Sequence, residues 1–585
     1  MIHHPRFVDG KSCFCLKALP LTAFFLFLSL SSPLGSLHAA PIPDAGTLMQ
    51  VQPKSSPQLP VESAPALSPE VPAATEEKAG PLITVKAFRI VGSKAIAESE
   101  LQAQLVGYVG KEYSFKQLQA IAMRLVGHYV QKGYLTRVFI APQEFTDGTV
   151  TYTVVEGKVG SLSLTADPTA KRIDAPRLER MLNARVTSGE LLSLQTLGEA
   201  TNILNNQPGV KATATLKPGN AEGGVDIAVL AADTPLATYT AQVNNTGSRA
   251  TGLMQATGST TLNNPTGHFD QASLLANLSE GIAYGSADYS IALGNRGLRL
   301  GVNGSYMDYR ITQSSLSSLD AHGTAGSIGL YGSYPIMMQT QKSLIVSGGL
   351  NQKSLTDYAL GAQIDYRIVT DGNITLSGSW NNGLIPGFVN YTANLVVGRV
   401  DLTNNPDALL QDQATRNTSG SFTKLTWRVT DILSLGRKWS MLTNLRGQFA
   451  DQNLDTSEQF TLGGLNAVRA YPVGEAFGDE GWLLSVDVMR PVTDKLNVKL
   501  FVDYGQITLN HNTWTGWNAY SPGLPNNYAL SAAGVGADWK VSSFASITAT
   551  LAVPLTSNPG RNSNNRNTDG TPNNGFASLG LNTNF

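Results

Sequence analysis

The spacing of hydrophobic and polar residues divides the chain beyond residue 80 into two regions. Over residues 82–158, strand-like runs with a period of two alternate with stretches of helical period, in the order strand, helix, helix, strand, strand. The longest helix follows a capping box of Ser114 and Gln117, and four hydrophobic residues fall on one of its faces: Leu118, Ile121, Leu125 and Tyr129. Strands are predicted at 82–91, 135–145 and 149–157, with Asp147-Gly148 as a hairpin signal between the last two.

The same order of elements recurs over residues 159–233. A strand at 159–166 precedes a short helix around 178–182, a helix capped by Ser193, and strands at 210–217 and 224–231. Two successive units of about 75 residues indicate an internal repeat. We therefore predict two small α+β domains, although such a pair alone is compatible with many functions.

From Pro235 to Phe585 the pattern changes to short alternating runs separated by Gly, Asn, Asp and Ser, and no helix is predicted. In the run 497–505, Val498, Leu500, Val502 and Tyr504 alternate with Lys499, Phe501, Asp503 and Gly505. The last strand, 577–585, repeats the pattern. An apolar face outside and a polar face inside are what a β-barrel in lipid requires, so a membrane barrel is favoured over a soluble sandwich.

The N-terminal 80 residues form neither kind of domain. Residues 1–40 have the parts of a secretory signal peptide: basic residues, the apolar core LTAFFLFLSL (21–30) and a cleavage zone ending at Ala39 or Ala40. Both cysteines, Cys13 and Cys15, precede that core, so we expect none in the mature chain. Residues 41–80 are rich in proline and are predicted to be an extended linker, with one short helix at 44–52.

Composition narrows the classes of function. With 42 Lys+Arg against 43 Asp+Glu, the chain has no electrostatic footprint for nucleic acid. Beyond Ala40 there is no run of 18 apolar residues, so a membrane-spanning region has to be made of strands. No phosphate-binding loop, metalloprotease helix or Cys-x-x-Cys motif is present, and we expect no enzymatic activity, no cofactor and no metal.

The most informative stretch is 459–488, followed by FVDYG at 501–505. It contains Val468, Arg469, Ala470 and Tyr471, and the second motif supplies Phe501, Asp503 and Gly505. Asp503 lies on the face predicted to point inward, where a carboxylate needs a partner, and a guanidinium offers a forked, charge-assisted one. Without further information, a solvated Arg469 and a water-facing Asp503 are equally compatible with the alternation.

These two motifs and the order of domains resemble the two-partner secretion transporters (TpsB), the haemolysin secretion/activation type within the outer-membrane assembly superfamily. The resemblance extends over nearly the whole mature chain and implies a plug helix and linker (41–80), POTRA 1 (81–158), POTRA 2 (159–234) and a barrel of about 16 antiparallel strands (235–585). It also implies a loop at about 451–482 that folds into the barrel, with Arg469 meeting Asp503. The family more often has Gly where this chain has Ala470.

The function implied by the resemblance is an outer-membrane pore that translocates, and activates in some members, a large exported partner protein (TpsA type) such as an adhesin, haemolysin or toxin. The POTRA domains would lie in the periplasm and bind the partner by strand addition. The expected surroundings are outer-membrane lipid, and insertion would need the outer-membrane assembly machinery. An outer-membrane insertase is the main alternative; a solute porin would not need the two repeats.

The sequence leaves several details open. Without the resemblance, 14 or 18 strands fit residues 235–585 as well as 16 do. As a polyproline II helix, the linker after the short helix would reach about 87 Å at about 3.1 Å per residue, which is enough for that helix to leave the barrel. The Asn-rich segment 561–574 is expected to be an extracellular loop whose role is solvation.

Overall fold

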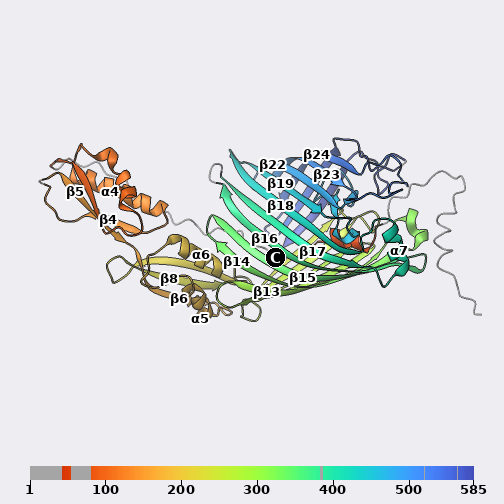
Figure 1. Ribbon diagram of the computed structural model, residues 1–585, viewed down its shortest axis with the longest axis horizontal. Coiled ribbons are helices and arrows are strands. Elements are labelled where there is room, and N and C mark those ends of the chain that lie inside the picture. The colour runs from red at the N-terminus through yellow and green to blue at the C-terminus, as the bar shows by residue number, and fades with distance from the viewer. Residues whose placement is uncertain (1–42, 54–80, 146, 383–385, 520, 563) are drawn as a thin grey trace, which may run out of the picture.

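The structure is a computed structural model that describes residues 43–53, 81–145, 147–382, 386–519, 521–562 and 564–585. Two small α+β domains precede a large barrel in which a short helix lies (Figure 1). The predicted signal peptide and most of the linker lie outside the described residues. None of the described helices is long and apolar enough to cross a membrane.

The first α+β domain, expected to be POTRA 1 and called so below, contains one three-stranded sheet and a long helix that packs on it. The sheet order is β2 (Ala87–Val91), β5 (Thr149–Glu156), β4 (Thr136–Ile140), and the helix is α4 (Phe115–Gln131). The domain also contains β1 (Ile83–Thr84), α3 (Glu98–Ala103) and β3 (Glu112–Tyr113). The capping box of Ser114 and Gln117 is formed, and the four hydrophobic residues predicted on one face of α4 are buried. Burial raises the pKa of Tyr129 to about 12, so its hydroxyl stays protonated and donates to Glu156 at 2.9 Å.

Two strand predictions in this domain are wrong in detail. The run 82–91 is two strands, because the chain pairs with β3 up to Thr84 and, from Ala87, with β5. The run 135–145 ends as a strand at Ile140, two residues before Pro142, which cannot donate to a ladder. The Asp147-Gly148 turn therefore closes a longer loop, in which the side-chain amide of Gln143 bonds both backbone groups of Thr151.

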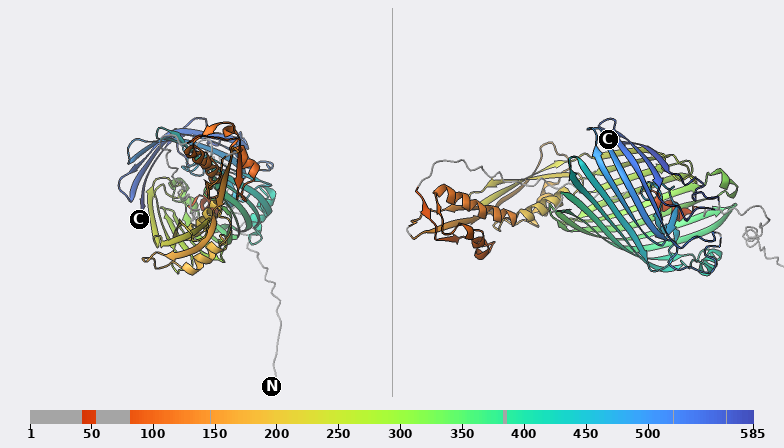
Figure 2. Two further views of the ribbon diagram at one scale, coloured as in Figure 1. Left: turned by 90° about the vertical axis from the view of Figure 1, so that its left-hand side faces the viewer. Right: turned by 90° about the horizontal axis from the view of Figure 1, so that it is seen from above.

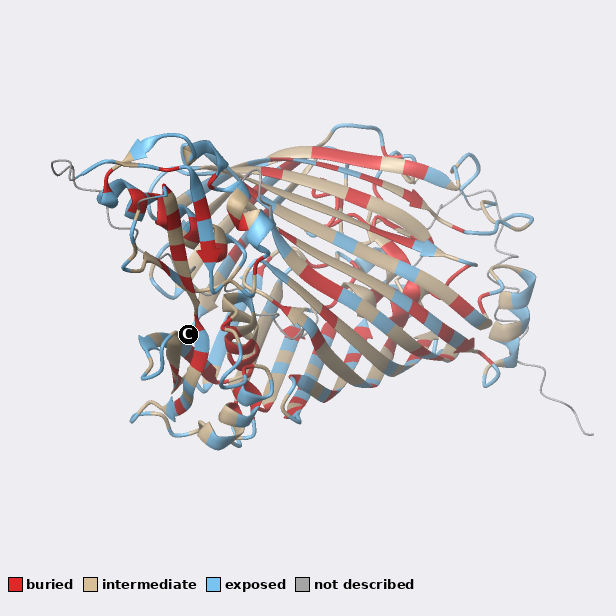
Figure 3. Ribbon diagram, turned by 60° about the vertical axis from the view of Figure 1, so that its left-hand side comes forward, coloured by how far each residue is buried: buried red, intermediate tan, exposed pale blue. Residues whose placement is uncertain are grey.

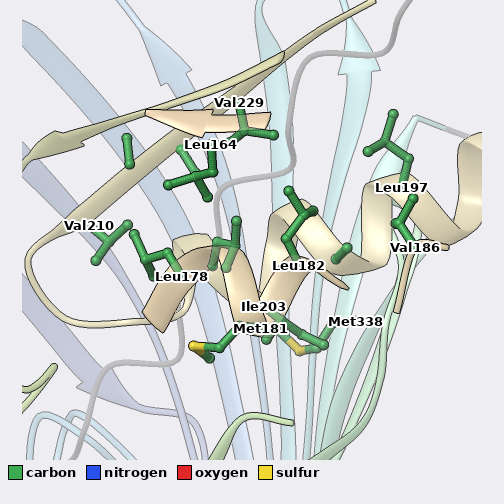
Figure 4. Close-up of a cluster of buried hydrophobic side chains, with 14 of the residues drawn as sticks. Leu164, Leu178, Met181, Leu182, Val186, Leu197, Ile203, Val210, Val229 and Met338 are labelled. Atoms are coloured by element: carbon green, nitrogen blue, oxygen red, sulfur yellow. The ribbon is translucent and has the colours of Figure 1, made fainter. Parts of the chain in front are cut away.

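POTRA 2 repeats the layout and is packed onto the barrel. It consists of β6 (Lys158–Ala166), α5 (Ala175–Asn183), α6 (Leu194–Asn205), β7 (Val210–Pro218) and β8 (Gly224–Asp233), with sheet order β6-β8-β7. Its hydrophobic core continues into one end of the barrel through Phe269, which lies between two strands, and through the strand residues Ala292, Met338 and Ile345. Figure 4 shows Met338 beside Ile203 and Met181. Arg177 donates to the carbonyls of His268 and Ala292 at 3.0 and 2.7 Å. We conclude that POTRA 2 and the barrel share one core.

Sixteen antiparallel strands form a closed barrel, as predicted from the resemblance. They are β9 (Ala237–Asn244), β10 (Gln255–Asn263), β11 (Gln271–Leu278), β12 (Ile282–Leu293), β13 (Leu298–Arg310), β14 (His322–Met338), β15 (Lys342–Ala359), β16 (Ala362–Asn382), β17 (Gly387–Asp401), β18 (Gly420–Gly436), β19 (Trp439–Ala450), β22 (Glu480–Pro491), β23 (Leu496–Thr508), β24 (Asn527–Lys540), β25 (Ala545–Pro554) and β26 (Phe576–Asn584). β26 closes the ring by pairing with β9 from Gly580–Asn244 to Asn584–Thr240. Both POTRA domains lie beyond one end of the barrel (Figure 2).

The two faces of the strands differ as the alternation predicted. On β23, Leu500 and Val502 are 59% and 52% exposed on the outside, whereas Phe501 and Asp503 are 3% and 0% exposed on the inside. Figure 3 shows the resulting alternation of buried and exposed residues on the barrel strands. The prediction of no helix after Pro235 is wrong at α7 (Pro406–Ala414), which lies at the end of the barrel away from the POTRA domains (Figure 1). It is capped by Asn405, whose side chain accepts from the Ala408 amide.

A closed barrel of this size should resist unfolding by detergent until it is heated. We expect the purified protein to migrate faster in gel electrophoresis without heating than after boiling, because the ladder between strands has no free edge from which detergent can unfold it. Identical migration before and after boiling, or solubility without detergent, would contradict the membrane barrel.

Candidate functional site

The segment between β19 and β22, residues 451–479, turns back into the lumen of the barrel. It contains one turn of 3-10 helix, η3 (Thr456–Glu458), and a hairpin of β20 (Phe460–Leu462) and β21 (Ala476–Gly478). Its apolar residues pack with residues of the inner wall, including Phe501, Leu530 and Ala552. We call this segment the in-folded loop.

The tip of the in-folded loop brings Arg469 against the barrel wall. Its Nε and Nη2 atoms donate to Asp503 at 2.9 and 2.6 Å, and its backbone amide donates to the same carboxylate at 3.0 Å. The guanidinium also lies over the ring of Phe501, 3.6 Å from the centroid. Arg469 is 6% exposed and Asp503 is 0% exposed, so the pair is withdrawn from water and its electrostatic attraction is strong.

A second carboxylate, Asp487 on β22, completes this arrangement. It accepts from Nη1 and Nη2 of Arg469 at 3.1 and 2.6 Å, so the guanidinium is held between two neighbouring strands. Sequence reasoning missed Asp487, although the alternation in WLLSVDVM (482–489) places it on the same face as Ser485 and Leu483. A search for inward-facing carboxylates on strands next to β23 would have found it.

The other motif residues set the shape of the tip. Val468 and Tyr471 are fully buried, and Tyr471 donates from its hydroxyl to the carbonyl of Thr556 at 3.2 Å. Ala470 needs no left-handed backbone, because the positive φ angles of this loop are at Gly463, Gly464 and Gly474. A Cβ at Gly505 would lie 2.5 Å from Cδ2 of Leu462, so glycine lets the in-folded loop approach the wall.

The Asn-rich segment 561–574, which was expected only to be solvated, forms hydrogen bonds with the in-folded loop. Glu475 of the in-folded loop is 2% exposed and accepts from the amide and hydroxyl of Thr568, at 3.1 and 2.8 Å. The side chain of Asn558 donates to the same carboxylate. Two buried amides, Asn558 and Asn567, bond each other across this segment. The segment therefore contacts the in-folded loop.

A short helix in the lumen, α2 (Ala45–Val51), meets the in-folded loop at one arginine. Arg367 on β16 is 3% exposed and donates from Nη2 to Asp44, the N-cap of α2, at 2.8 Å. Three more carboxylates surround it: Asp357 and Asp365 on the wall, and Asp455 of the in-folded loop. Thr456, also of that loop, donates to Asp44 at 2.6 Å. We call α2 the plug helix.

The plug helix is closely packed. Ala45 and Leu48 lie in a cluster with Tyr284, Tyr309 and Phe422 of the wall, and Gln52 accepts from Asn277 at 2.8 Å. A Cβ at Gly46 would lie 2.5 Å from Oγ1 of Thr456 and 2.8 Å from the Ser457 amide, so only glycine fits there.

The lumen contains a cavity of about 1130 Å³ that borders the plug helix at Met49 and Gln50. It is lined mainly by polar side chains and, on POTRA 2, by Asn205–Pro208. No group of His, Cys, Asp and Glu with metal-binding geometry occurs in the described part of the chain. The lumen is thus filled in part by two segments of the chain itself, the plug helix and the in-folded loop.

Comparison with known proteins identifies the family. The model of the "Haemolysin secretion/activation protein ShlB/FhaC/HecB" family matches residues 223–536, and the "POTRA domain, ShlB-type" model matches residues 83–157. The chain belongs to this family. It is therefore a two-partner secretion transporter of the outer membrane with its POTRA domains in the periplasm.

Two curated relatives and a solved structure that are similar to this chain are transporters as well. The heme/hemopexin transporter protein HuxB of Haemophilus influenzae is 26% identical over 89% of this chain and 93% of its own length, and the hemolysin transporter protein ShlB of Serratia marcescens is 24% identical over 75% and 78%. The structure of CdiB from Escherichia coli superposes with a TM-score of 0.65 at 19% identity, over 89% of this chain and 94% of CdiB. These matches favour export of a large partner protein over membrane-protein insertion.

Proposed function

We propose that this transporter takes up its exported partner in extended form at the POTRA domains and passes it through the lumen once the plug helix has left. The partner would be a large adhesin, haemolysin or toxin. The observation that carries the proposal is the shared contact at Arg367, where the wall, the plug helix and the in-folded loop meet. No phosphate-binding loop occurs in the sequence, so folding of the partner outside the cell would supply the driving force.

β7 is an edge strand of the POTRA 2 sheet, and we infer that the partner would be added along it on the way to the lumen. The side-chain amide of Asn205 donates to the Ala212 carbonyl at 3.1 Å and accepts from the Ala212 amide at 2.6 Å, as a neighbouring strand would. Asn205 also lines the lumen cavity. A partner strand added along β7 beyond Ala212 would thus run towards the pore, with backbone hydrogen bonds that do not depend on its sequence.

The edges of POTRA 1 would make the first contact. On its outer strand β2, the carbonyl of Phe88 accepts a hydrogen bond from the side-chain amide of Gln102 at 2.9 Å.

We expect deletion of residues 82–157 to abolish export while the barrel remains inserted. Capture of the partner needs the POTRA repeat, whereas insertion of the lipid-facing strands does not. Secretion of the partner into the medium and heat-modifiable migration of the variant are the two measurements. Normal secretion by the deletion variant would contradict the capture role.

The in-folded loop, in this proposal, fixes the shape of the lumen. Arg469 ties its tip to β22 and β23, and Asp455 ties its beginning to Arg367 on β16, so the loop links distant strands across the barrel. The barrel itself would be inserted by the outer-membrane assembly machinery, as its lipid-facing strands require.

A further inference from the structure

Two arginines that form no ion pair with any described residue lie side by side on the lumen wall. Arg428 on β18 and Arg446 on β19 are direct cross-strand neighbours, and both line the lumen cavity. Directly opposed residues on antiparallel strands have Cβ atoms about 4.5–5.5 Å apart, and like charges in such pairs destabilise the sheet.

The other three basic side chains of the cavity, Lys353, Lys424 and Arg299, each contact a hydrogen-bond acceptor or a carboxylate of the protein. Lys353 and Lys424 both contact Glu458, Lys424 at 2.8 Å. Arg299 donates to the Phe269 carbonyl and to the Ser290 hydroxyl, at 2.9 and 2.8 Å. Each of these three therefore has a close acceptor.

Arg446 and Arg428 have no comparable acceptors. Nη2 of Arg446 reaches only the carbonyls of Thr461 and Asn466, each at 3.4 Å, and its buried Nε has no hydrogen-bond partner. Arg428 is exposed to the lumen and forms no ion pair with any residue that the structure describes. Arg446 also lies over the ring of Phe460, 5.1 Å from its centroid, but no carboxylate among the described residues pairs with either arginine.

The lining of the lumen cavity carries an excess of positive charge. Five basic side chains line it against three acidic ones, Asp288, Asp371 and Glu458, whereas the whole chain has a net charge of −1. The excess of two is the number of charges that Arg428 and Arg446 contribute. A narrow, low-dielectric passage with charge of one sign concentrates ligands of the other sign.

We propose that Arg428 and Arg446 form a contact site for carboxylate side chains of the exported polypeptide while it is extended in the lumen. Guanidinium groups bind carboxylates in a forked geometry, and alternate residues of an extended chain point the same way about 6.6 Å apart, within reach of two long side chains. The site lies in the cavity that also borders Asn205–Pro208 of POTRA 2, so a chain leaving β7 enters it. This inference rests on the proposed export of an extended partner.

The test is binding of a synthetic decaglutamate peptide, carrying an uncharged dye, to the full-length protein in detergent at low salt, measured by fluorescence anisotropy. Decaglutamine is the neutral probe, because strand addition at the POTRA edges would bind both peptides. We expect the double variant Arg428→Gln/Arg446→Gln to bind decaglutamate about three- to tenfold more weakly than wild type, with unchanged binding of decaglutamine. The double variant Arg428→Lys/Arg446→Lys should keep most of the affinity.

The matched control is Arg437→Gln/Lys438→Gln, which removes two charges from exposed positions in the turn of the same hairpin. It should bind decaglutamate like wild type. Equal affinity of wild type and Arg428→Gln/Arg446→Gln, or a wild type that does not prefer decaglutamate to decaglutamine, overturns the contact site. Export of the partner by wild type, measured separately, keeps that failure distinct from a failure of the transport function.

Discussion

Replacing Arg469 with alanine should abolish or sharply reduce secretion of the partner while the barrel stays in the outer membrane. The variant keeps the hydrogen bond from the backbone amide of residue 469 to Asp503 but loses the four that the Arg469 side chain donates to the wall. Asp487 and Asp503 are then left without their cation. Removing the cation from buried carboxylates lowers the stability of the folded protein by about 3–5 kcal/mol if they are fully buried, and by less where lumen water reaches them. Secretion and heat-modifiable migration are the measurements.

The two aspartates should not be equivalent in this test. Asp503 accepts three of the five bonds and is fully buried, whereas Asp487 accepts two. After Asp503→Ala, Arg469 keeps Asp487 as a counter-ion, so we expect a loss smaller than that of Arg469→Ala and larger than that of Asp487→Ala. Arg469→Lys keeps the charge but not the fork, and should retain part of the secretion.

A double-mutant cycle decides whether the pair acts as a unit. The variant Arg469→Ala/Asp503→Ala removes one of the stranded carboxylates, so its loss should be smaller than the sum of the two single losses. Strictly additive effects on secretion and on the heat stability of the barrel would show that the residues act independently, and the in-folded loop would then need another anchor, for which Glu475 is placed.

The sequence was sufficient to predict those features that have a local period. The capping box at Ser114, the repeat of two α+β units and the alternation on β23 are each visible within a few residues, and the structure contains all three. The helix α7 was missed because nine residues with few apolar positions show no helical period; the Asn405-Pro406 start was its only local signal.

Contacts between distant segments were not predictable in the same way. Asp44 and Arg367 are 323 positions apart, and neither lies in a motif. Thr568 and Glu475 are 93 positions apart, and only Glu475 belongs to a segment that was expected to fold into the barrel. A pattern of polarity shows which residues face the lumen, but it does not show which of them meet there, because that depends on how the in-folded loop and the plug helix fill the barrel.

Placing alanine at Gly46 should release the plug helix. The added Cβ would lie 2.5–2.9 Å from Thr456, Ser457 and Arg367, one of these contacts being a backbone amide that cannot rotate away. Overpacking of this kind costs about 1–3 kcal/mol, which shifts the equilibrium between docked and released plug about 5- to 150-fold. Alanine also favours helix more than glycine by about 1 kcal/mol, so loss of the helix itself would not explain the result.

Release of the plug is measured as single-channel conductance in a planar bilayer, where Gly46→Ala should show larger and more frequent openings than wild type. Gly127→Ala is the matched control: Gly127 also lies in a helix, α4, and a Cβ there meets nothing within 4 Å. Deleting residues 41–60 should reproduce the effect of Gly46→Ala. Unchanged conductance in both the deletion and Gly46→Ala would count against a plug.

The charges around Arg367 are compatible with the proposed departure of the plug helix. When Asp44 leaves with the helix, Arg367 still pairs with Asp357, Asp365 and Asp455. Its charge therefore stays compensated, and the Asp44 carboxylate is solvated by water.

Asp44→Asn should weaken docking of the plug helix only modestly, since asparagine caps a helix as well as aspartate does. Arg367→Gln should do more, because it leaves three wall and loop carboxylates with no cation and loosens the in-folded loop together with the plug. We thus expect conductance to rise in the order wild type, Asp44→Asn, Arg367→Gln, and secretion to fall only in the last; a reversed order would mean that the plug is held by its apolar contacts rather than by this arginine.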